Sequence, residues 1–115
     1  LNYIRMHNER KILVKGETGT HSVHLSRLFY VESRGHEITW HGADGDIKSY
    51  GTMKKTEEML GDGFFRCNSS YIVNLKYVES VNDFDVVVGK DVLTISHQRK
   101  KEFRKALADY YGGKV

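Results

Sequence analysis

The chain contains no proline and a single cysteine, Cys67, among its 115 residues. One cysteine excludes an intrachain disulfide, and so little cysteine is typical of proteins from a reducing compartment. No proline breaks a helix or strand. We therefore expect a cytoplasmic protein that is stabilised by a hydrophobic core without covalent cross-links.

Long apolar runs are also missing. None approaches the roughly 20 residues that a transmembrane helix needs, and no signal peptide opens the chain. Hydrophobic residues make up 39% of the sequence and charged residues 29%, as in ordinary globular domains. We expect one domain with no membrane contact and, because the first residue is Leu1 rather than Met, a fragment of a longer protein.

Motifs for catalysis and metal binding are absent as well. The six histidines form no H-E-x-x-H, there is no C-x-x-C, and His21 and His24 would point to opposite faces of one strand. There is no G-x-S-x-G, and Gly89-Lys90 lacks the rest of a phosphate-binding loop. The sequence predicts no catalytic residue, no metal site and no cofactor.

Positive charge is concentrated in two segments. Residues 64–76 contain Arg66 and Lys76 without an acid, and residues 97–105 contain five basic residues against Glu102 alone. Since the whole chain carries +3, the remainder has a net charge of −3. Charge gathered in this way is typical of proteins that face a polyanion. The alternative, a solvated basic helix face, explains Arg104 and Lys105 well and the coincidence of the two segments less well.

Short β-branched and aromatic runs bounded by turn residues predict about eight or nine strands. Thr52 and Gly61 are suited to begin and end a central helix, and residues 98–111 read as a final helix. The predicted strands cover residues 11–15, 21–25, 28–33, 36–41, 46–50, 71–75, 77–81, 84–88 and 92–95. Turns of two to four residues favour antiparallel pairing, so we expect a mostly β fold with small antiparallel sheets.

Two sequence segments place polar side chains where apolar strands stop or start. The first is the string from Phe64 to Asn74, F-F-R-C-N-S-S-Y-I-V-N, and the second runs from Leu93 to Phe103, L-T-I-S-H-Q-R-K-K-E-F. Short polar and basic side chains at strand ends make poor core residues. They suit loops that contact a phosphate backbone and the base edges beside it.

The first string resembles the F-x-R-x-H-x-S-Y/F-x-V-N core of LytTR-type DNA-binding domains, and the second resembles the closing signature of that family. The resemblance covers roughly residues 8–110. It implies an elongated LytTR-like arrangement of small antiparallel β-sheets with a short central helix and a C-terminal helix. On this interpretation residues 1–10 are a linker remnant from a missing N-terminal receiver domain, residues 11–111 form the DNA-binding domain and residues 112–115 are a tail.

Carried over residue by residue, the resemblance predicts three loops that approach DNA: Arg34-Gly35-His36, Asn68-Ser69-Ser70 and the start of the last helix. The predicted DNA-binding residues are Arg34, His36, Arg66, Asn68, Ser69, Ser70, His97, Gln98, Arg99, Lys100 and Lys101. Arg34 and His36 can read base edges or contact phosphate, whereas the basic run from Arg99 to Lys101 suits phosphate.

Several residues have a structural interpretation beside the functional one. Arg66 fits DNA contact and anchoring to a carboxylate about equally, and Asn74 is better suited to capping a turn than to touching DNA. Cys67 reads as a semi-buried neighbour of the loop, or as a thiol made reactive by Arg66. We expect the histidines at 21, 24 and 41 on strand surfaces, and the aromatic residues Trp40, Phe64, Phe65, Tyr71 and Phe103 in the core.

The resemblance implies the output domain of a two-component response regulator that binds promoter DNA and controls transcription, in the subgroup for quorum sensing or bacteriocin production. Its partner would be double-stranded DNA with imperfect direct repeats, bound by a homodimer when the protein is full length and phosphorylated. The alternative is a β-rich RNA- or protein-interaction module without DNA specificity. RNA readers usually expose aromatic residues on a sheet face, which the alternation here disfavours.

Overall fold

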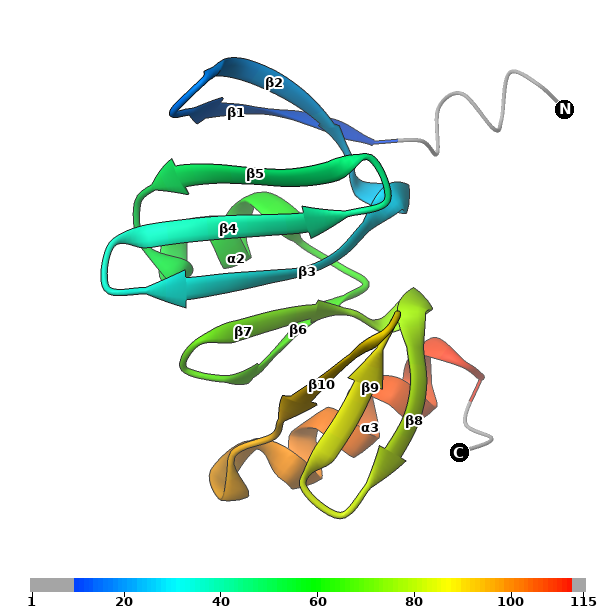
Figure 1. Ribbon diagram of the computed structural model, residues 1–115. Coiled ribbons are helices and arrows are strands. Elements are labelled where there is room, and N and C mark those ends of the chain that lie inside the picture. Colours follow the sequence, from blue (N-terminus) through cyan, green and yellow to red (C-terminus); the bar gives the residue numbers. More distant parts are fainter. Residues whose placement is uncertain (1–9, 113–115) are drawn as a thin grey trace, which may run out of the picture.

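The computed structural model describes residues 10–112. Ten strands, two α-helices and three 3-10 turns follow one another along this part of the chain (Figure 1). The strands are β1 (Lys11–Gly16), β2 (Gly19–His24), β3 (Leu28–Arg34), β4 (Glu37–Gly42), β5 (Gly45–Tyr50), β6 (Phe64–Asn68), β7 (Tyr71–Asn74), β8 (Val78–Asn82), β9 (Asp85–Val88) and β10 (Asp91–Thr94). The helices are α2 (Met53–Leu60) and α3 (Lys100–Tyr110), and the 3-10 turns are η1 (Leu25–Arg27), η2 (Leu75–Tyr77) and η3 (His97–Arg99).

Two antiparallel sheets lie one beyond the other along a body of 42 × 38 × 24 Å. The larger sheet has the order β2-β1-β5-β4-β3-β7-β6 and the smaller one β10-β9-β8. Within the larger sheet, β1 joins β5 only through the pair Gly16 and Ser49, so the β1–β2 hairpin is set apart from the rest (Figure 1). The predicted mostly β fold with small antiparallel sheets is confirmed.

One strand was not among those predicted. β6 pairs with β7 through four residue pairs, with a bulge between Arg66 and Asn68. Its sequence, F-F-R-C-N, has neither the alternation of a half-buried strand nor a continuous apolar run. Pairing with β7, rather than a local pattern, makes this segment a strand.

Helix α2 has the caps that the sequence predicted. Thr52 Oγ1 accepts a hydrogen bond from the Lys55 amide, and Gly61 ends the helix at φ 69°. Arg10 also contacts this helix end, because its guanidinium donates to the carbonyls of Leu60 (2.9 Å) and Met59 (3.2 Å). Arg10 is therefore part of the folded domain; the rest of the predicted linker and most of the predicted tail lie outside the described residues.

Two hydrophobic cores support the two parts of the body. The first core surrounds Trp40 and packs α2 against β1 and β3–β5, and the second surrounds Phe103 of α3 beneath the smaller sheet. Trp40 and Phe103 are buried as predicted, whereas Phe64, Phe65 and Tyr71 are only half-buried at the margins of these cores. Within residues 10–112 no helix is both long and apolar enough to span a bilayer.

The side chain of Asn74 lies at the junction between the sheets. It is buried, donates to the carbonyls of Leu25 (3.2 Å) and Leu28 (2.8 Å), and accepts from the Lys76 amide (3.1 Å) as the N-cap of η2. The prediction that Asn74 caps a turn is confirmed. A second link is the hydrogen bond from the Tyr30 hydroxyl to Asp91 (2.8 Å), which joins β3 to the smaller sheet.

Candidate nucleic-acid interface

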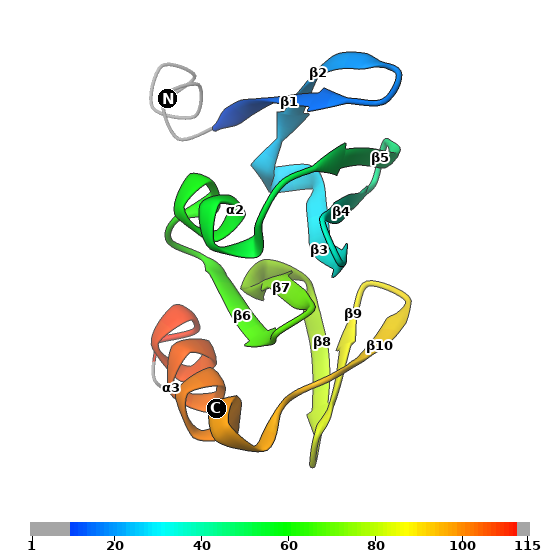
Figure 2. The same ribbon diagram turned by 90° about the vertical axis from the view of Figure 1, so that its left-hand side faces the viewer.

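The three predicted loops lie along one edge of the molecule. The β3–β4 turn, the β6–β7 turn and η3 follow one another down the left side of Figure 1, and Figure 2 shows the same edge from the front. The first two are joined by a hydrogen bond from the Ser33 amide to the Ser70 carbonyl (2.9 Å). Segments that are far apart in the sequence thus form one surface.

The β3–β4 turn presents two exposed side chains. Gly35 adopts φ 61°, a conformation that permits the tight turn, and Arg34 and His36 on either side are exposed. The Arg34 side chain is 83% exposed, and its Nε lies 3.9 Å from Glu32 Oε2. At this distance and exposure the ion pair is weak, so Arg34 is available to a ligand.

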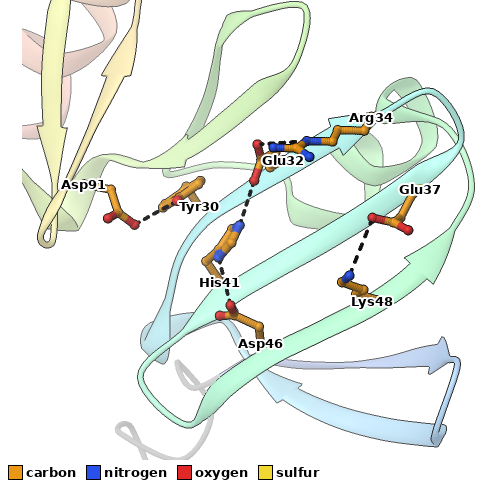
Figure 3. Close-up of polar contacts among 8 residues, drawn as sticks. All are labelled: Tyr30, Glu32, Arg34, Glu37, His41, Asp46, Lys48 and Asp91. Atoms are coloured by element: carbon orange, nitrogen blue, oxygen red, sulfur yellow. Dashed lines mark hydrogen bonds and ion pairs between the residues drawn. The ribbon is translucent and has the colours of Figure 1, made fainter.

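Behind this turn, a ladder of charged side chains crosses the face of β3, β4 and β5 (Figure 3). His41 lies between two carboxylates, with Nε2 3.0 Å from Glu32 and Nδ1 3.2 Å from Asp46, and its ring stacks on Tyr30 at 4.3 Å. His41 lies on strand β4 as predicted, on the face opposite the buried Trp40, and these contacts leave its side chain 19% exposed. The ladder holds Glu32, and through it supports the base of the turn.

Asn68 in the β6–β7 turn uses both ends of its amide group within the protein. Its Nδ2 donates to the Thr94 carbonyl at the end of β10, and its Oδ1 accepts from the Ser70 amide (2.6 Å). The next residue, Ser69, is exposed at the tip. Asn68 therefore ties the turn to β10, and Ser69 is the side chain that the turn presents.

Arg66 stands at the base of the same turn and is half-buried. Its guanidinium donates to the Ser69 carbonyl (2.9 Å). Of the two interpretations of Arg66, the structure favours the anchor, although the acceptor is a backbone carbonyl and not a carboxylate.

The third loop is attached to β6 by backbone acceptors. The Ser96 amide donates to the Cys67 carbonyl (2.9 Å), and Arg99 donates to the Arg66 carbonyl (3.3 Å). Residues 97–99 form η3, and α3 begins at Lys100, two residues later than the helix predicted over residues 98–111. Gln98 and Lys101 are exposed, whereas Arg99 is half-buried.

A fourth turn, between β8 and β9, lies beside η3. Asp83 Oδ1 contacts Lys100 Nζ at 2.8 Å, and the Phe84 ring stacks near His97 with centroids 4.0 Å apart. The sequence predicts a tight turn at Asn82-Asp83 but gives no signal that it would lie next to residues thirteen to seventeen positions away in the chain. Asp83 and Phe84 are thus neighbours of the predicted site that sequence reasoning missed.

The predicted site residues therefore fall into two groups. The "tips" are exposed, and each of the "braces" uses at least one polar side-chain atom to bind a neighbouring protein group. The tips are Arg34, His36, Ser69, Gln98 and Lys101; the braces are Arg66, Asn68, Arg99 and Lys100; Ser70 and His97 lie between the two groups. An edge that is cross-linked by hydrogen bonds and carries exposed polar side chains is suited to bind a regular polyanion.

Cys67 lies directly behind this edge and is fully buried. Burial raises the pKa of its thiol to about 12, and the nearby Arg99 opposes the shift only in part. The interpretation of Cys67 as a reactive thiol is wrong, because the nucleophile is the thiolate and a neutral, enclosed thiol reacts slowly. Within residues 10–112 no three His, Cys, Asp or Glu side chains are grouped as metal ligands.

We expect the native Cys67 thiol to react with a disulfide reagent at pH 8 at least about tenfold more slowly than the same thiol in denaturant.

The raised pKa of Cys67 also predicts that the stability of the fold depends on pH. The ordinary pKa of a cysteine thiol is 9.0 and that of Cys67 in the folded chain is about 12, so as pH rises the thiol of the unfolded chain loses its proton first. The free energy of unfolding should then fall as pH rises above about 9, by up to about 1.4 kcal/mol per pH unit. Denaturant titrations of the parent chain and Cys67→Ala at pH 8 and 10 check this; an equal decline in both would contradict it.

Comparison with known proteins places this geometry in a family. Residues 18–108 match the LytTr DNA-binding domain family. Accessory gene regulator protein A of Staphylococcus aureus (strain N315) is 30% identical over 74 residues, which cover 61% of this chain and 31% of that protein. Accessory gene regulator A of Staphylococcus aureus (strain COL) matches to the same extent. This chain thus spans about a third of the length of these curated relatives.

A solved structure has the same fold. The LytTr DNA-binding domain assigned to a methyl-accepting/DNA response regulator from Bacillus cereus superimposes with a TM-score of 0.72 at 20% identity. The match covers 84% of this chain and 95% of that domain. Because the family match extends over most of the chain and the fold agrees, this chain belongs to the LytTr DNA-binding domain family, whose members bind DNA and are not enzymes.

Proposed function

We propose that this domain binds specific sequences of double-stranded DNA and controls transcription as the output domain of a two-component response regulator. One observation carries the proposal: the segments that present the exposed tips Arg34, His36, Ser69, Gln98 and Lys101 follow one another along one edge (Figures 1 and 2), and hydrogen bonds of the braces support these segments. Side chains of this kind supply both donors and acceptors for base edges and positive charge for phosphates.

Two roles are distributed among the tips. Arg34 and His36 read bases from the β3–β4 turn, and Ser69 reads them from the β6–β7 turn. Lys101, in the first turn of α3, contacts phosphate as a point charge, and Gln98 lies between these regions. Spacing the reading groups over separate turns allows the domain to follow successive parts of a duplex.

Relatives named accessory gene regulators support the finer assignment to quorum sensing or bacteriocin production, in a cytoplasmic regulator. On this proposal the full-length protein binds imperfect direct repeats as a homodimer after phosphorylation of a receiver domain.

The alternative function is that of an RNA- or protein-interaction module. Proteins that read single strands stack the bases on exposed aromatic side chains. Tyr30, Trp40 and Phe103 are buried, and no stack of aromatic rings is exposed on a sheet face within residues 10–112.

A competition experiment tests the proposal. A duplex pool is first selected for binding, and the chosen duplex, its separated strands and RNA of the same sequence then compete for the protein. We expect the duplex DNA to compete at least about tenfold better than the other two. Equal competition by a single strand or by RNA would favour the alternative.

Replacing Lys101 tests its assignment to phosphate. Lys101→Ala should weaken binding to all duplexes alike and reduce the slope of log K against log salt by about 1. Lys90→Ala is the matched control. Lys90 is exposed in the β9–β10 turn, at the end of the smaller sheet opposite to the β8–β9 turn and η3. Fluorescence anisotropy at several salt concentrations gives both slopes. A loss confined to one base pair of the target would contradict the phosphate assignment.

A further inference from the structure

The β8–β9 turn brings an acidic side chain to the edge that the tips occupy. In Figure 1 this turn lies at the foot of the molecule, close to η3 and the start of α3, and Figure 2 shows it next to the same segments. Asp83 is 72% exposed there. A carboxylate facing the phosphate backbone opposes binding unless its charge is neutralised.

The Asp83 carboxylate is neutralised by Lys100. Its Oδ1 lies 2.8 Å from Lys100 Nζ, and the Lys100 side chain is only 25% exposed. The ammonium also sits over the Phe84 ring, 4.2 Å from the centroid, so both residues of the turn hold it. Lys100 is therefore paired within the protein and only partly exposed, although it stands within the basic run of α3.

The turn is also fixed to η3 itself. The Ile95 amide donates to the Phe84 carbonyl (2.7 Å), and the Phe84 ring stacks near His97 at 4.0 Å and 36°. These contacts keep Asp83 opposite Lys100, so the pairing is a feature of the folded edge and not a chance contact between two flexible chains. Asp83 has φ 56°, which Asn adopts as readily as Asp.

We propose that Asp83 is a specificity-determining residue, which neutralises Lys100 and thereby limits sequence-independent attraction to DNA. The inference rests on the proposed DNA-binding function. Non-specific binding comes almost entirely from cations that contact phosphates, and a protein that is not held in register can shift to use any free cation. In the specific complex the reading tips fix the register, so a freed Lys100 gains less there. Removing the acid should consequently raise non-specific binding more than specific binding.

Asp83→Asn is the direct test. It keeps the size and backbone preference of residue 83 and releases Lys100. For a scrambled duplex at about 0.15 M salt we expect about fivefold tighter binding and a salt slope steeper by about 1. The ratio of specific to non-specific affinity should fall. Anisotropy with the selected and the scrambled duplex, each over a range of salt, measures all three quantities.

Two further variants complete the design. Asp83→Asn combined with Lys100→Met removes both charges, and its slope should return to that of the parent chain, because the pair contributes no net charge. Asp44→Asn is the matched control: Asp44 is an exposed turn acid paired with Arg27 (2.7 Å) in the β4–β5 turn, at the opposite end of the sheet from the β3–β4 turn. Asp44→Asn changes the net charge of the chain by the same amount as Asp83→Asn. A similar gain in affinity for the scrambled duplex in Asp44→Asn would therefore overturn the proposal.

The inference is also overturned if Asp83→Asn leaves the salt slope unchanged, weakens binding to the scrambled duplex, or raises the affinity for both duplexes by the same factor. Thermal denaturation shows whether each variant is folded at the assay temperature. Failure of the proposed function has a different signature, since the parent chain would then bind neither duplex more tightly than single strands. A parent chain that selects its duplex, together with an unresponsive Asp83→Asn, rejects the role of Asp83 alone.

Discussion

Asn74→Ala should lower the free energy of unfolding by about 2–4 kcal/mol, because it leaves buried backbone groups without partners. The side chain is buried and makes three hydrogen bonds, to the carbonyls of Leu25 and Leu28 and to the amide of Lys76. Alanine can replace none of them.

The effect of Asn74→Ala should exceed that of an ordinary turn substitution because Asn74 joins two parts of the fold. It stands at the end of β7 and binds the carbonyls of the first residue of η1 and of the residue that follows η1, so its loss loosens the junction from which the smaller sheet begins. Chemical denaturation measures the change directly, and a fall of about 10 °C or more in melting temperature should accompany it.

Asn82→Ala makes the same chemical change at an exposed position at the end of β8 and serves as the control. We expect it to cost less than about 0.5 kcal/mol. Equal effects of the two variants would show that the buried contacts of Asn74 contribute little. Well below its melting temperature, Asn74→Ala should retain DNA affinity, since Asn74 lies at the opposite end of β7 from the Asn68-Ser69-Ser70 turn.

Local patterns in the sequence were enough to predict elements whose stabilising contacts are themselves local. The alternation of Ile38 and Trp40 with polar residues identifies β4, because these two side chains are buried while their neighbours are not. Thr52 and Gly61 likewise identify the ends of α2 through contacts within a few residues. Strand β6 has no such signal, since its hydrogen bonds and its bulge depend on β7.

The candidate site likewise has one part that the sequence predicts and another that depends on contacts between distant residues. Loops with polar tips could be placed from the motif strings, and the structure brings them to one edge. The braces could not be told from the tips, because their partners are distant in the sequence: Asn68 binds Thr94, and Lys100 binds Asp83. Which polar side chain is free for a ligand depends on tertiary contacts that amino-acid type does not specify.

Asn68 offers the sharpest test of this division. We expect Asn68→Ala to weaken binding to the selected duplex by about 10- to 100-fold, because the β6–β7 turn loses its hydrogen bond to the end of β10, the strand that leads into η3. The substitution removes the donor to the Thr94 carbonyl and the acceptor for the Ser70 amide. Ser69, the reading group at the tip of this turn, would then be held less firmly relative to η3. Small displacements of such groups cost binding steeply, because every hydrogen bond to a base edge needs its own geometry.

A panel of duplexes with single base-pair changes separates a brace from a reader. Asn68→Ala should reduce discrimination at several positions together, since it disturbs two segments, whereas Ser69→Ala should relax one position by about 1–3 kcal/mol. Asn68→Asp keeps the acceptor for Ser70 but loses the donor to Thr94, so it should fall between the parent chain and Asn68→Ala. If Asn68→Ala instead relaxed a single base pair and left the others intact, Asn68 would read that base itself. Its amide would then have to leave Thr94 on binding, and the edge would be remodelled by DNA rather than built in advance.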